Sequence, residues 1–99
     1  MEPTYLRVIF FSKDGKSYSV HIELNDDDKA LLASDTSMEW KTDSLVLRAG
    51  VLDFLPSELA DHWQGSGEVI NHDIADSPHT SGAAIVAGKD DRKMWIREG

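Results

Sequence analysis

Two stretches near the beginning of the chain carry the clearest pattern of apolar and polar positions. Residues 17–24 alternate strictly between the two kinds, and residues 5–12 are rich in β-branched and aromatic side chains. Both patterns are typical of β-strands. Residues 13–16, between them, have the composition of a tight turn in which Gly15 takes a positive φ. The pattern therefore predicts an N-terminal β-hairpin.

Two registers of this hairpin compete. A two-residue loop at Asp14 and Gly15 places Arg7 among the apolar residues of the second strand. A three-residue loop with a bulge at Gly15 keeps Arg7 on the polar face instead, so we favour it. This register pairs Phe10 with Tyr18, Val8 with Val20 and Leu6 with Ile22. In both registers the first strand is apolar on both sides, which predicts an interior position in the sheet.

Two short helices are predicted near 26–33 and 56–64. Asn25 and three consecutive aspartates precede the first, as expected for an N-cap followed by an acidic first turn. Turn-forming residues at 34–37 end it. Pro56 suits the first turn of the second helix, on which Leu59 and Trp63 share one face.

The stretch 38–55 is ambiguous. The run Ser44–Ala49 reads as a strand followed by a loop, with residues 38–41 leading into it. The alternative is a helix that begins at Asp43 or Ser44 and continues to Leu55. Gly50 would then lie inside the helix and weaken it by about 1 kcal/mol relative to alanine. This cost favours the strand.

The rest of the chain adds further strands. Residues 68–75 are expected to form one, and residues 83–87 and 93–97 form a closing hairpin, with Met94 and Ile96 on one face and Trp95 on the other. The chain is therefore expected to be one α+β domain over residues 1–99. Its sheet is mainly antiparallel, with about five or six strands.

The charge is unevenly distributed. The chain has a net charge of −8, yet residues 25–76 hold twelve acidic residues against three basic ones, a net of −9. Such a surface repels phosphate backbones and anionic lipid, so direct nucleic-acid binding and membrane docking are not expected. The excess of one sign is instead suited to a basic protein partner.

Cysteine is absent, and no apolar run approaches the length of a membrane span. The first residues also lack the basic region of a signal peptide. Small secreted domains often depend on disulfides, so these features predict a cytoplasmic protein.

Catalytic and metal-binding patterns are weak. His62, His72 and His79 lie close in sequence but match no ligand spacing, and we interpret them as scattered histidines. The aspartates at 26–28 lack the frame of a calcium loop. Ser77, with Asp73 and His79, lacks the surroundings of a hydrolytic nucleophile. Without cysteine, thiol catalysis is excluded. No enzyme activity, metal or cofactor is expected.

These observations predict a non-catalytic, acidic protein-binding module that inhibits or regulates a larger basic protein, one that handles nucleic acid for example. Trp40 has only polar neighbours, so it is expected to be half exposed, and exposed tryptophan is enriched at interface hot spots. The candidate partner-binding residues are Asp26, Asp27, Asp28, Asp35, Glu39, Trp40 and Asp43.

Two other functions stay open. One is a small enzyme or ligand- or metal-binding domain built on His62, His72 and His79. The other is an accessory subunit of an oligomeric assembly, with Tyr5, Ile9 and Phe11 as an exposed apolar face. The acidic charge does not forbid a homodimer, provided that the acidic segments face away from each other.

Overall fold

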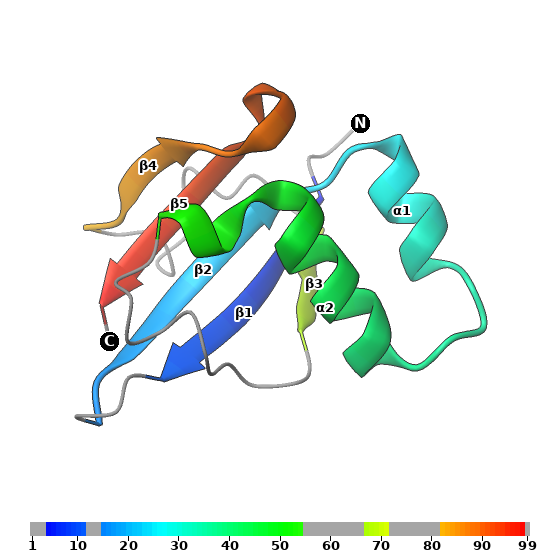
Figure 1. Cartoon of the computed structure of the whole chain (residues 1–99), viewed down its shortest axis with the longest axis horizontal. Coiled ribbons are helices and arrows are strands. Elements are labelled where there is room, and N and C mark those ends of the chain that lie inside the picture. The colour runs from blue at the N-terminus through cyan, green and yellow to red at the C-terminus, as the bar shows by residue number, and fades with distance from the viewer. Residues whose placement is uncertain (1–3, 12–14, 55–66, 72–81, 99) are drawn as a thin grey trace.

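The computed structural model describes residues 4–11, 15–54, 67–71 and 82–98. Five antiparallel strands form one sheet in the order β3-β1-β2-β5-β4 (Figure 1). The strands are β1 (Tyr5–Phe11), β2 (Ser17–Glu23), β3 (Glu68–Ile70), β4 (Ala84–Ala87) and β5 (Lys93–Glu98). This arrangement confirms the predicted α+β fold class.

The N-terminal hairpin has the register that the position of Arg7 favoured. Phe10 pairs with Tyr18, and Arg7 lies opposite the buried His21 on the face that does not carry the main core. Gly15 has a φ of 86°, as the turn requires. β1 also pairs with β3, so its predicted interior position is confirmed.

The C-terminal half supplies the other strands. The closing hairpin of β4 and β5 is confirmed, with Met94 in the core and Trp95 on the opposite face. β3 begins at Glu68, as predicted, and ends at Ile70. The remainder of the strand predicted over 68–75, beyond residue 71, lies outside the described residues. So does the helix predicted over 56–64.

The first helix, α1 (Asp26–Leu32), is confirmed together with its cap. The Asn25 side chain accepts a hydrogen bond from the backbone N–H of Asp28 at 2.9 Å, and the Asp28 carboxylate accepts one from the N–H of Asn25 at 3.2 Å. This reciprocal pair is a capping box.

The strand predicted over 44–49 is wrong, because residues Met38–Ala49 form a second helix, α2. The alternative helix had the right type but the wrong ends. Ser37 is the N-cap, and Gly50 is not an interior residue but the left-handed C-cap, with a φ of 73°. The short 3-10 turn η1 (Val51–Asp53) follows.

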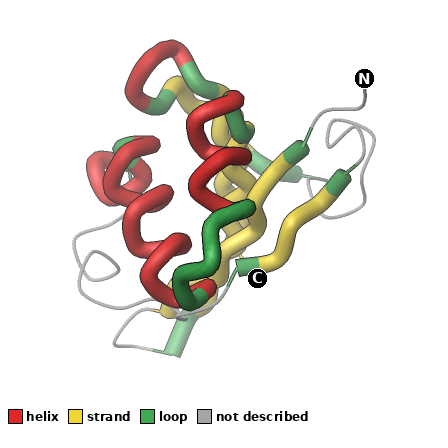
Figure 2. Tube along the Cα trace, turned by 90° about the vertical axis from the view of Figure 1, so that its right-hand side faces the viewer, coloured by secondary structure: helices red, strands yellow, loops and turns green. Residues whose placement is uncertain are grey.

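Both helices cover one face of the sheet, which gives a two-layer structure (Figure 2). The main core lies between the layers and is built from alternate residues of the strands and from the inner face of α2. Its buried members are Leu6, Val8, Phe10, Val20, Ile22, Leu24, Leu45, Val46, Ala49, Val51 and Met94. On the opposite face of the sheet, Tyr5 and Trp95 meet edge to face with ring centroids 5.0 Å apart.

Candidate functional site: the acidic helical layer

Of the three aspartates in the first turn of α1, two lie at the surface and one lies in the interior. Asp26 and Asp27 are exposed beside the helix N-terminus, where the helix dipole favours negative charge. Asp28 points inward and is completely buried. The structure therefore separates Asp28 from the other predicted partner-binding residues.

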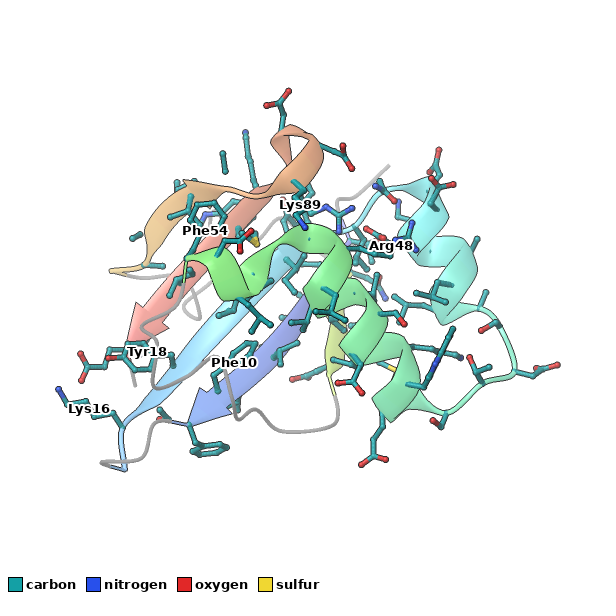
Figure 3. The ribbon with its side chains drawn as sticks, in the orientation of Figure 1. Phe10, Lys16, Tyr18, Arg48, Phe54 and Lys89 are labelled. Carbon is teal, nitrogen blue, oxygen red and sulfur yellow. The ribbon has the colours of Figure 1, made fainter. Side chains whose placement is uncertain are left out.

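Asp28 is held by two arginines. Its Oδ2 lies 2.7 Å from Nη1 of Arg92, which is also buried, and its Oδ1 lies 3.8 Å from Nη2 of Arg48. Figure 3 shows Arg48 extending from α2 toward α1. Within the described part of the chain, Oδ1 of Asp28 accepts no hydrogen bond. Its interaction with Arg48 is an ion pair alone. Asp28 and these arginines serve the fold.

A second charged side chain, that of Lys41, also makes its contacts inside the protein. Lys41 lies on the inner side of α2 and is buried. Its ammonium group donates to the carbonyl oxygens of Leu32, at 2.9 Å, and Ser34. These carbonyls belong to the C-terminal end of α1, where a positive charge is favourable. Lys41 thus ties α2 to α1 and adds no positive charge to the surface.

The outer face of α2 presents the remaining predicted residues. Ser37 caps the helix by accepting from the N–H of Trp40 at 3.4 Å, and Glu39 and Asp43 are both exposed. Trp40 is 52% exposed, in agreement with the prediction from its polar neighbours. Leu47 is 61% exposed on the same helix.

The two helices therefore expose more negative than positive charge. Five carboxylates are exposed on α1, on the segment that joins the helices and on α2, and we call these residues the acidic helical layer. They are Asp26, Asp27, Asp35, Glu39 and Asp43. Of the basic residues of this region, Lys41 is buried, Lys29 is half-buried, and Arg48 is exposed with its guanidinium 3.8 Å from Asp28.

Sequence reasoning missed Leu47, Arg48 and Arg92. The misassigned strand hid Leu47, because alternation from Leu45 would have placed both leucines on one buried face. The ion pair of Asp28 with Arg92 joins residues far apart in sequence, and no local pattern indicates it. For Asp28 a signal existed, since the third residue of a capped helix often returns its side chain to the cap.

The residues proposed for an enzyme or a metal site are not described by the structure. His62, His72, Asp73, Ser77 and His79 lie outside the described residues. Across 4–11, 15–54, 67–71 and 82–98, no three histidine or acidic side chains are grouped so as to hold a metal ion.

The apolar face proposed for an assembly is mostly covered. Tyr5 is buried against Trp95 and Ile70, and Ile9 is half-buried. Phe11 alone of the three named residues is exposed, at 38%. A broad apolar face is therefore not formed by these side chains.

None of the helices in the described ranges combines the length and apolar character needed to cross a bilayer. Comparison with protein families, with curated protein sequences and with solved structures gives no match for this chain.

Proposed function

We propose that the chain is a non-catalytic protein-binding module that inhibits or regulates a larger, basic protein through the acidic helical layer. Immunity proteins that neutralise toxins, and phage inhibitors of host nucleases, share this size and charge. That likeness is an analogy of physical profile. In a nucleic-acid-handling partner, the carboxylates would occupy the places of phosphates.

One observation carries the proposal. The carboxylates of the acidic helical layer are exposed, while of the three basic residues on the same two helices Lys41 is buried and Lys29 is half-buried. Lys41 is bonded to the end of α1, and Arg48, whose side chain is 43% exposed, lies 3.8 Å from the buried Asp28. A surface of one sign attracts a partner of the opposite sign, raises the rate of association and disfavours wrong partners.

The same charge argues for the class of partner. A net charge of −8 is unfavourable for contact with nucleic acid or anionic lipid, so a basic protein is the favoured partner. The absence of cysteine is consistent with a cytoplasmic site of action.

The proposal is tested by affinity capture from cells of the source organism, at low and at high salt, with mass spectrometry of the retained proteins. The matched bait carries Asp26→Asn, Asp27→Asn, Asp35→Asn, Glu39→Gln and Asp43→Asn, and leaves the buried Asp28 in place. We expect the native bait to retain one basic protein at low salt and to lose it as salt screens the contact. The neutralised bait should retain none of it. Equal retention by both baits would contradict the proposal.

A further inference from the structure

We propose that the outer face of α2 is the docking surface, and that its occupant is a basic amphipathic α-helix of the partner protein. This inference rests on the proposed function and specifies the surface and the chemistry of recognition. Trp40 and Leu47 are large and apolar, yet they are 52% and 61% exposed.

The two apolar residues share one line along the helix. They are seven positions apart, which corresponds to two turns, an angular offset of about 20° and a rise of about 10.5 Å. An apolar pair with this spacing matches the repeat by which one helix recognises another. Neither side chain belongs to the core of the protein, which α2 contacts through Leu45, Val46 and Ala49.

The acids lie on one flank of that line. At about 100° per residue, Glu39 and Asp43 both fall on the same side of the line from Trp40 to Leu47. They are one turn apart, with a rise of about 6 Å between them. A partner helix that combines an apolar ridge with lysine or arginine along one flank would satisfy both features together.

Two other occupants are disfavoured. A second copy of the chain would bring Glu39 and Asp43 against the same carboxylates, at a net charge of −8 for each copy. An extended peptide gains affinity from main-chain hydrogen bonds to an open sheet edge. The middle of α2 offers none, because its backbone groups are bonded within the helix. Recognition there depends on side chains, which a helix presents in the matching repeat.

The surface is also organised in advance. Ser37 and Gly50 fix the two ends of α2, and the buried inner face holds it on the sheet. Lys41 joins it to α1. Docking therefore requires little ordering of the backbone, which leaves more of the contact energy for affinity.

The test uses two synthetic peptides of about 18 residues, or five turns of helix. One has leucines in a seven-residue repeat with lysines along one flank, and the other has the same composition in scrambled order. Isothermal titration at low and high salt gives their affinities for the native chain. We expect the helical peptide to bind at least about tenfold more tightly than the scrambled one.

Variants locate the site. We expect Trp40→Ala and Leu47→Ala each to weaken binding of the helical peptide by at least about tenfold. The matched control is Ile85→Ala, since Ile85 on β4 is 66% exposed and should leave the affinity unchanged. The inference would be overturned if the two peptides bound equally or if the helical peptide did not bind. It would also be overturned if Ile85→Ala lost as much affinity as Trp40→Ala and Leu47→Ala. The proposed function would fail separately, by equal capture on the native and neutralised baits.

Discussion

The Arg92 guanidinium lies 2.7 Å from the Asp28 carboxylate, and both side chains are buried. This ion pair joins the first turn of α1 to the residue immediately before β5. The N–H of Gly88 donates to the Arg92 carbonyl at 2.7 Å, which fixes the backbone of the arginine in the β4–β5 connection. The helical layer that carries the exposed acids is thus attached to the sheet by a charge that the sequence alone assigned to the surface.

Removal of that carboxylate should be costly. Asp28→Asn leaves Arg92 buried without its counter-charge, and loss of one partner of a buried pair typically costs about 3–5 kcal/mol. Asp27→Asn removes the same charge from an exposed position in the same turn and should cost no more than about 1 kcal/mol. Urea denaturation of both variants measures the free energies of unfolding. Similar values for the two would show that the ion pair does not hold α1.

Lys41→Met should also destabilise the protein. The ammonium group satisfies the carbonyls of Leu32 and Ser34, and hydrogen bonds to a charged group contribute about 1.5–3 kcal/mol. Lys93→Met is the control, because Lys93 is exposed on β5 and its loss changes the net charge equally. We expect the control to lie within about 0.5 kcal/mol of the native protein. Thermal denaturation that affects both variants alike would contradict the assigned role of Lys41.

A close approach of two backbones can be tested at Gly88. A Cβ atom there would lie 2.5 Å from the carbonyl oxygen of Ala49, at the end of α2. Because that oxygen is backbone, α2 would have to shift, and Gly88→Ala should cost about 1–3 kcal/mol. Gly15→Asn is the control, since nothing lies within 4 Å of a Cβ there and asparagine tolerates a positive φ. An unchanged unfolding free energy for Gly88→Ala would contradict the close packing of the β4–β5 connection on the end of α2.

The N-terminal hairpin and α2 show what the sequence reveals and what it conceals. The register was predictable because a one-residue slip would move Arg7 to the wrong face, so a single charge decides it. In α2 the buried face includes the polar residues Lys41 and Thr42, whereas Leu47 and Trp40 are exposed. Thr42 is accommodated by a hydrogen bond to the Met38 carbonyl, at 2.7 Å. Buried polar and exposed apolar residues together remove the helical period of apolar positions by which a helix is recognised in a sequence.

The candidate site was likewise predictable only in its local features. The excess of acids over residues 25–76, of which 55–66 and 72–76 lie outside the described residues, and the exposure of Trp40 followed from local composition. The burial of Asp28 did not, because it depends on Arg92, which is distant in sequence.

Binding kinetics should distinguish the two helices of the acidic helical layer. With the partner recovered by capture, the double variant Asp26→Asn, Asp27→Asn should mainly lower the association rate, since long-range attraction is the role proposed for these acids. Glu39→Gln with Asp43→Asn should lower the association rate and also raise the dissociation rate, because both residues flank the proposed docking surface of Trp40 and Leu47 on α2. Surface plasmon resonance at two salt concentrations measures both rates. Identical effects of the two double variants would contradict this division of roles.

Site-specific photo-crosslinking in the complex with the captured partner shows which face of the protein the partner contacts. A photoreactive amino acid replaces Leu47 on α2 in one sample and Ile85 on β4 in another, two apolar positions of similar exposure, 61% and 66%. If the acidic helical layer binds the partner, position 47 should yield the crosslinked product and position 85 should not. Crosslinking from position 85 alone would place the partner on the sheet edge and contradict binding at the acidic helical layer.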